Sequence, residues 1–222
     1  MVNIGTLNKI SPVGLDRFSD NYTVSEADNK SEAIIVRSAD MHEMDLGDGL
    51  EIIARAGVGV NNIPLDKCAE KGIVVVNAPG ANANGVKELV ICAMIMTYRN
   101  VVPAVTWASS LIGTEDVPGQ VEKGKSRFKG KEIKGKKIGV IGLGGIGSMV
   151  ANALSDLGME VTGYDKFFSD TIKARLRENI IIADDIVSCV ADCDFITVHL
   201  HATEETKHMI NKEVISCAKD GA

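Results

Sequence analysis

The sequence lacks any long hydrophobic run. Its longest apolar stretch, Leu89–Met96, is far shorter than the ~20 residues that a membrane-spanning helix needs. The N-terminus also lacks the charged and apolar segments of a secretory signal peptide. We therefore expect a cytoplasmic protein that has no membrane partner.

Paired cysteines and an excess of basic charge are missing as well. The five cysteines are odd in number and show no paired zinc spacing, so we expect free thiols in a reducing compartment. The net charge of −6 argues against general nucleic-acid binding. Lysine and arginine do cluster between positions 123 and 137, but glycines interrupt this cluster, which predicts a solvated loop rather than a nucleic-acid site.

A glycine-rich turn between a strand and a helix is the most informative motif. Residues 138–141 form a short apolar run typical of a strand, and a helix is predicted from Ile146 to Leu157. Between them, Gly142 permits a tight turn, Gly144 lets a pyrophosphate approach the backbone, and Gly147 allows close packing of the helix on the strand. Free amides at the helix start, including those of Gly145 and Ile146, then face the phosphates.

An acidic residue ends the next predicted strand, which covers residues 159–164. At this position the Asp165 carboxylate can accept both ribose hydroxyls of a dinucleotide and repel a 2′-phosphate. The sequence therefore predicts NAD rather than NADP as the cofactor. A methyltransferase shares the glycine turn and the acidic strand tip, but residues 55–62 and 77–90 have no place in that architecture.

Alternating strands and helices indicate an α/β fold with two parallel-sheet domains of Rossmann-like or flavodoxin-like type. The predicted strands are Val2–Leu7, Ala33–Arg37, Glu51–Ala54, Ile73–Asn77, Lys137–Ile141, Glu160–Tyr164, Ile180–Ile182 and Asp194–Leu200, and the helices include Pro64–Lys71, Gly85–Asn100 and Lys212–Ala218. The helix at 85–100 is apolar nearly all round, which predicts a buried helix at a domain or subunit junction.

We expect a substrate-binding domain over residues 1–95 and a nucleotide-binding domain over 96–222. The latter would lack its last two strands and leave the strand at 195–198 as a bare edge.

The chain resembles the D-isomer-specific 2-hydroxyacid dehydrogenases, and within them the NAD-dependent 3-phosphoglycerate dehydrogenases of serine biosynthesis. The matching segments are Ile35–Ser38, Arg55–Asn62, Lys71–Pro79, Lys87–Val90, Gly142–Gly147, Gly163–Asp165 and Cys193–His199. This resemblance implies oxidation of D-3-phosphoglycerate to 3-phosphohydroxypyruvate with NAD. It also implies a homodimer or higher oligomer, with which the apolar helix at 88–98 is compatible.

The same resemblance implies roles for individual residues. Arg37 and Ser38 would meet the substrate phosphate, which suits the forked donor group of an arginine. The backbone from Gly57 through Val58 to Gly59 would hold the carboxylate in a nest of amides. Val58 would also approach the nicotinamide, and the family's polar position at the domain crossing is taken by Asn82.

Two departures from the family pattern bear on function. Many relatives carry proline after the Val-His pair, whereas Leu200 and His201 follow His199 here, so the cofactor contacts of these three residues are expected to differ in detail. No metal site is expected, because no acidic or cysteine ligand lies at ligand spacing from the histidines. The catalytic arginine, glutamate and histidine of the family would lie past Ala222, so no catalytic residue is assigned to this chain.

Several functions therefore stay open. The chain is expected to be a fragment of a 3-phosphoglycerate dehydrogenase. The alternatives are a dehydrogenase of another D-2-hydroxyacid, a non-catalytic NAD-binding module and an inactive truncated product.

Overall fold

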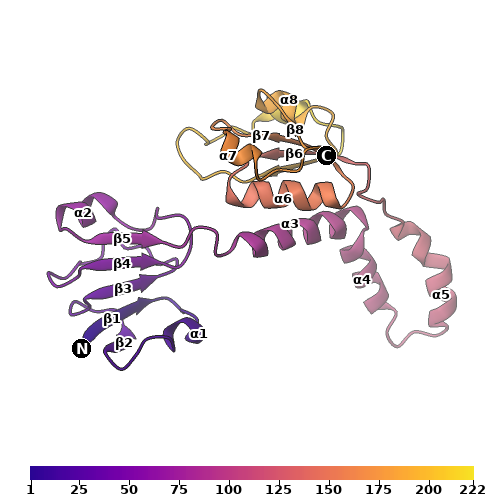
Figure 1. The fold of residues 1–222 in the computed structure, drawn as a ribbon. Coiled ribbons are helices and arrows are strands. Elements are labelled where there is room, and N and C mark those ends of the chain that lie inside the picture. Colours follow the sequence, from indigo (N-terminus) through magenta and orange to yellow (C-terminus); the bar gives the residue numbers. More distant parts are fainter. The chain divides into compact units, whose positions relative to one another are not determined.

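The computed structural model describes all 222 residues, which form two compact units, Met1–Asn82 and Ala83–Ala222 (Figure 1). The domain boundary expected near residue 95 lies inside a helix that belongs wholly to the second unit. Each unit contains one parallel β-sheet, so the predicted α/β fold class with two parallel sheets is confirmed.

The first unit is a five-stranded parallel sheet with the order β2-β1-β3-β4-β5. Its elements are β1 (Val2–Leu7), α1 (Pro12–Leu15), β2 (Tyr22–Glu26), β3 (Ala33–Val36), β4 (Ile52–Arg55), α2 (Leu65–Glu70) and β5 (Val74–Asn77). This is the flavodoxin-like order, in which ligands bind beyond the carboxyl ends of the strands. Its core contains fully buried side chains of β3 and β4, including Ile34, Val36 and Ile53. Met41 and Leu46, from the loop that connects β3 to β4, join them.

The second unit contains a four-stranded parallel sheet with the order β8-β7-β6-β9. Its helices and strands are α3 (Ala83–Tyr98), α4 (Val101–Ser110), α5 (Val117–Gly124), η1 (Lys125–Phe128), β6 (Lys137–Ile141), α6 (Gly145–Asp156), β7 (Glu160–Tyr164), α7 (Asp170–Lys173), β8 (Ile181–Ile182), α8 (Ile186–Val190), β9 (Phe195–Val198) and α9 (Lys212–Ser216). This order equals strands 3-2-1-4 of a dinucleotide-binding fold. Strand β9 pairs with β6 alone, so the expected bare edge is present.

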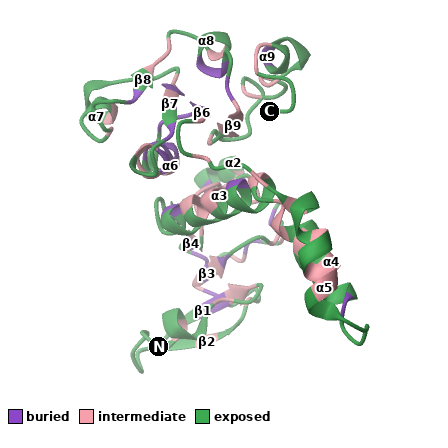
Figure 2. Ribbon diagram, turned by 90° about the vertical axis from the view of Figure 1, so that its right-hand side faces the viewer, coloured by how far each residue is buried: buried purple, intermediate pink, exposed green.

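The helix predicted over residues 85–100 is covered only in part within the chain, and its predicted place at a domain or subunit junction stays a prediction. In α3 only Ala83 and Met94 are buried, and Met94 joins the core beneath α6. Leu89 is 69% exposed, and Figure 2 shows most of α3 and α4 as exposed or intermediate. One face of α3 packs on α6, while the remaining apolar faces have no cover within the chain.

A left-handed residue separates α3 from α4. Asn100 has φ 51° and ψ 35°, and the two helices meet there at a bend of 62°. The chain that returns after η1 is attached at the same place, because the Lys131 amide donates to the Tyr98 carbonyl at 2.9 Å.

The cluster of basic residues at 123–137 lies partly on α5 and η1 and not wholly in a loop, as the sequence had suggested. The guanidinium of Arg127 stacks over the Trp107 ring, 4.7 Å from the ring centre.

Candidate functional site

The glycine turn after β6 has the close backbone packing that its sequence predicts. Gly142 has φ +90°, and a Cβ there would lie 2.6 Å from the His199 carbonyl oxygen. Its amide donates to the Tyr164 carbonyl at 2.8 Å, which ties the turn to β7. A Cβ on Gly147 would collide with the Gly142 carbonyl oxygen. Both positions are buried, so a side chain at either would separate α6 from the sheet.

The middle of the same turn is open. Gly144 and Gly145 are exposed, and no heavy atom lies within 4 Å of a Cβ built on either of them. The amides of Gly145, Ile146 and Gly147, at the start of α6, find no acceptor within the chain. A helix N-terminus with free amides and an uncovered backbone suits the two phosphates of a dinucleotide, since the helix dipole favours negative charge there.

Asp165 connects the tip of β7 to the glycine turn. Its Oδ2 accepts the Leu143 amide at 2.7 Å, and its Oδ1 accepts the Phe167 amide at 2.8 Å. A carboxylate has about four lone-pair positions, so it retains acceptors for ribose hydroxyls. The carboxylate thus fits the predicted ribose role and also fixes the turn that faces the phosphates.

The loop after β9 borders the turn from the other side. The His199 amide donates to the Ile141 carbonyl at 2.8 Å, and its Nε2 lies 3.0 Å from the Thr197 hydroxyl. Burial lowers the pKa of the His199 imidazole, which favours the neutral ring. The Leu200 side chain lies 2.8 Å from the Cβ position of Gly142, whereas the exposed His201 contributes its carbonyl to a hydrogen bond from Thr206.

The strand order brings these groups together at the carboxyl ends of the strands of the second sheet. The sequence order of the strands reverses between β6 and β9, and at such switch points open α/β sheets bind their ligands. Gly142, Gly147, His199 and Leu200 meet there, and Asp165 joins them through Leu143. The His201 side chain makes no hydrogen bond to this group.

In the first unit, Arg37 and Ser38 follow β3 at the carboxyl edge of the sheet. Both side chains are exposed. The Asn8 side chain, at the end of β1, accepts the amides of Ser38 at 2.9 Å and Ala39 at 2.6 Å. This contact fixes the backbone of the loop and leaves the Arg37 guanidinium free of any carboxylate.

The loop after β4 only partly offers the expected amides. The Gly57 amide donates to the Arg55 carbonyl at 2.8 Å, so it is already used, while the amides of Val58 and Gly59 have no acceptor within the chain. The Asn77 side chain donates to the Val58 carbonyl at 2.7 Å and holds this loop in place. Asn82 is exposed at the end of the first unit.

The structure adds Arg55, which the sequence reasoning did not select. Its half-buried guanidinium covers Gly57, and its Nε donates to the Arg37 carbonyl at 3.1 Å. Arg55 has no acidic partner. The sequence did offer a signal, because a charged residue ends the otherwise apolar strand Ile52–Arg55. In the structure Arg55 pairs in register with Val36, the residue before Arg37.

The wider molecule offers two further observations. No three His, Cys, Asp or Glu side chains lie together in a group that could hold a metal ion. No single helix has the length and apolarity to cross a bilayer, although α3 and α4 pass that test together as a bent pair.

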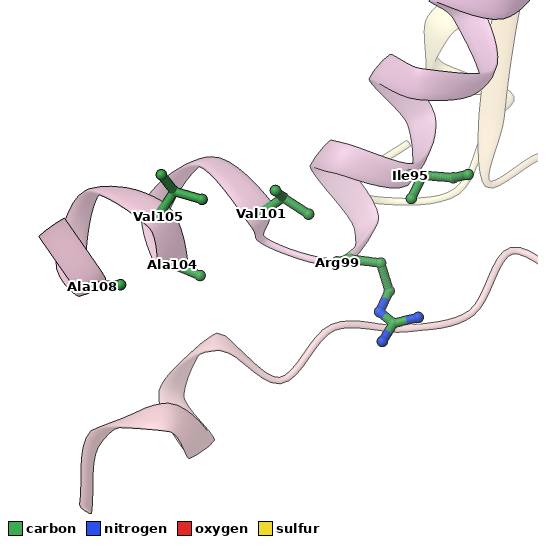
Figure 3. Close-up of a pocket in the computed structure, with 6 residues that line it drawn as sticks. All are labelled: Ile95, Arg99, Val101, Ala104, Val105 and Ala108. Carbon is green, nitrogen blue, oxygen red and sulfur yellow. The ribbon is translucent and has the colours of Figure 1, made fainter. Parts of the chain in front are cut away.

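A groove of about 530 Å³ lies at the junction of α3 and α4. Figure 3 shows its lining residues on the two helices and their connection, which are Ile95, Arg99, Val101, Ala104, Val105 and Ala108. Five of these six residues are apolar, and Val105 is 59% exposed. This groove belongs to the uncovered face of the helices and is separate from the glycine turn.

Comparison with known families identifies the chain. Residues 91–222 match the NAD-binding domain of the D-isomer-specific 2-hydroxyacid dehydrogenases. The chain belongs to this family. The predicted resemblance is thereby confirmed, and the match to an NAD-binding domain supports NAD as the cofactor.

Curated relatives of this dehydrogenase chain include two enzymes with different substrates. It is 37% identical over 195 residues to D-3-phosphoglycerate dehydrogenase of Methanocaldococcus jannaschii, covering 86% of this chain and 35% of the relative. It is also 37% identical over 193 residues to hydroxypyruvate reductase of Thermotoga maritima, covering 86% of this chain and 58% of the relative. The chain thus spans roughly a third to three fifths of these relatives.

Solved structures share the fold. The NAD-bound 3-phosphoglycerate dehydrogenase of Entamoeba histolytica superposes with a TM-score of 0.75 at 27% identity, covering 98% of this chain and 68% of that one. D-Lactate dehydrogenase of Aquifex aeolicus, complexed with NAD and lactic acid, superposes with a TM-score of 0.74 at 26% identity, covering 98% and 66%.

Proposed function

We propose that this chain is the NAD-binding and substrate-anion-binding part of a D-3-phosphoglycerate dehydrogenase, which oxidises D-3-phosphoglycerate to 3-phosphohydroxypyruvate. The choice of substrate rests on two arginines without an acidic partner, Arg37, which directly follows β3, and Arg55, which ends the adjacent strand β4. Free amides of Val58 and Gly59 lie in the loop that follows Arg55. Two cations suit a phosphate dianion, and loop amides suit a carboxylate.

Each unit has its own task in this proposal. The first unit, within the 1–95 range expected from the sequence, supplies the substrate anion site through Arg37, Ser38, Arg55 and the 57–59 loop. We keep Val58 and Asn82 as predicted contacts to the nicotinamide end and the domain crossing.

The second unit, within the 96–222 range, binds NAD. The amides at the start of α6 hold the pyrophosphate, Asp165 accepts from the adenosine ribose, and His199, Leu200 and His201 border the cofactor. When bound there, NAD would supply the hydride acceptor for the oxidation of the substrate. No residue of this chain is assigned to proton transfer.

A dehydrogenase of another D-2-hydroxyacid is the second candidate, since hydroxypyruvate reductase matches with the same identity. Such an enzyme needs no phosphate site, so the two arginines separate the two proposals. A non-catalytic NAD-binding module would bind NADH but neither acid.

The test compares 3-phosphoglycerate with D-glycerate, which lacks the phosphate, in calorimetric titrations of the NADH-loaded chain. We expect Arg55→Gln and Arg37→Gln each to weaken 3-phosphoglycerate binding about tenfold, because a charge-assisted hydrogen bond is lost, and to change D-glycerate binding little. Arg17→Gln, which removes an exposed arginine of the same unit, is the matched control. Equal losses for both acids would refute the phosphate role.

We also propose that two copies of the chain associate through α3 and α4. Support comes from the uncovered apolar side chains on these helices, among them Leu89, Val102 and Val105, which are 69%, 55% and 59% exposed. Apolar area of this kind is usually covered in an oligomer. Val105→Glu should shift the mass measured by light scattering to that of a monomer, whereas a monomeric wild-type chain would contradict the proposal.

A further inference from the structure

Two ordered turns lie beside the predicted ribose site. The first follows β7, where the Asp165 side chain accepts the Phe167 amide at 2.8 Å and its carbonyl accepts the Phe168 amide at 3.2 Å. The second follows β9, where the hydroxyls of Thr203 and Thr206 accept each other's amides at 3.2 Å and 2.9 Å. Thr206 also donates to the His201 carbonyl. These hydrogen bonds order the backbone on both sides of Lys166 in the first turn and of Glu205 in the second.

An ion pair joins the two turns. The Lys166 Nζ lies 2.9 Å from the Glu205 Oε2, although the two residues are 39 positions apart. The pairing raises the pKa of Lys166 and lowers the pKa of Glu205, so both groups are charged at neutral pH.

The position of Lys166 gives this pair a consequence for cofactor choice. Lys166 directly follows Asp165, the carboxylate assigned to the ribose hydroxyls, and a basic side chain near that hydroxyl is what accommodates the 2′-phosphate of NADP. A lysine has a long flexible stem, so its ammonium can turn toward a phosphate unless something holds it. Glu205 holds it and also adds a negative charge of its own.

We propose that Glu205 is a cofactor-selectivity residue, which pairs with Lys166 and so withholds from a 2′-phosphate the cation that adjoins Asp165. The proposal rests on the NAD site described above. Selectivity for NAD then has two parts, the repulsion by Asp165 and the neutralisation of Lys166 by Glu205.

The test measures dissociation constants of NADH and NADPH by nucleotide fluorescence for the wild-type chain and its variants. Glu205→Gln keeps the size of the side chain and removes its charge. We expect NADPH to bind about fivefold more tightly to E205Q, with NADH binding changed less than twofold. Adding Lys166→Met to E205Q should remove the gain.

Glu204→Gln is the matched control, because Glu204 is the neighbouring exposed carboxylate and pairs with Lys207 at 3.7 Å instead. A gain in NADPH affinity for E204Q as large as for E205Q would show a general charge effect and overturn the proposal, as would a gain that persists without Lys166. An unchanged E205Q would overturn it as well. Failure of the wild-type chain to bind NADH would instead refute the NAD site itself.

Discussion

Gly147→Ala is the substitution that best tests the packing of the glycine turn. The added methyl group would collide with the carbonyl oxygen of Gly142, which is backbone and buried. The nearest side-chain atom, Cβ of His199, lies 3.5 Å away. No flexible group can move aside, so α6 itself must shift away from β6.

The expected cost follows from two opposing terms. Overpacking of a well-packed site costs about 1–3 kcal/mol, and the upper end applies because the obstructing atom is backbone. Replacing glycine by alanine inside a helix returns up to about 1 kcal/mol. The net loss in the free energy of unfolding is therefore about 2 kcal/mol, which lowers a urea midpoint by about 1 M.

The single tryptophan allows the unfolding of the second unit to be followed by fluorescence. Trp107 lies on α4, in the same compact unit as Gly147, and its ring packs on Phe128 with the ring centres 5.1 Å apart. Urea unfolding followed by tryptophan fluorescence therefore reports on the second unit. NADH titration of the same samples reports on the cofactor site.

Gly145→Ala is the control in the same turn, because a Cβ there meets no atom within 4 Å. We expect it to leave the midpoint unchanged or slightly raised, yet to weaken NADH binding, since the methyl group covers the backbone that faces the pyrophosphate. The reasoning is refuted if Gly147→Ala unfolds at the wild-type midpoint, or if Gly145→Ala loses as much stability.

Two further predictions concern Asp165 and His199. Asp165→Ala should weaken NADH binding about tenfold and narrow the preference for NADH over NADPH in fluorescence titrations. Asp165→Asn keeps one acceptor oxygen, which can serve the Leu143 amide or the Phe167 amide but not both. It should therefore narrow the preference for NADH over NADPH with a smaller loss of thermal stability than Asp165→Ala, and equal losses for both nucleotides would contradict the ribose role. Burial lowers the pKa of His199 below 6.5 in the folded chain, so the unfolded chain binds the proton more readily and stability is lost as the pH falls from about 6.5. His199→Asn should flatten this decline between pH 7 and 5, and parallel curves for the two proteins would count against it.

Strands with short apolar runs were predictable, because such a run indicates a buried strand without knowledge of its neighbours. The strands at Val2–Leu7 and Lys137–Ile141 were predicted with the bounds that the structure has. Strand β2 was missed, because four of its five residues are exposed and Val24 is its only aliphatic side chain. Its pairing depends on β1, which is 20 residues earlier at the aligned positions Val2 and Tyr22 and therefore invisible to a local pattern.

The local turn structure was also predictable, whereas contacts between distant loops were not. The glycine turn and Asp165 lie within one strand–helix–strand unit, so their geometry follows from the order of the residues. Arg55 and the Lys166–Glu205 pair depend on which strands are neighbours and on side chains that meet across loops. The surface that would cover α3 could not be predicted for a related reason, since apolar composition does not reveal whether a covering surface belongs to the same chain.

The left-handed backbone of Asn100 sets the angle between α3 and α4. The helix beyond it, α4, has ten residues and is about 15 Å long. A change of about 10° at Asn100 would therefore move the far end of α4 by roughly 3 Å, close to the width of a methyl group. Any surface that is complementary to both helices must match this one angle, so the shape of the apolar face depends on the dihedral angles of a single residue.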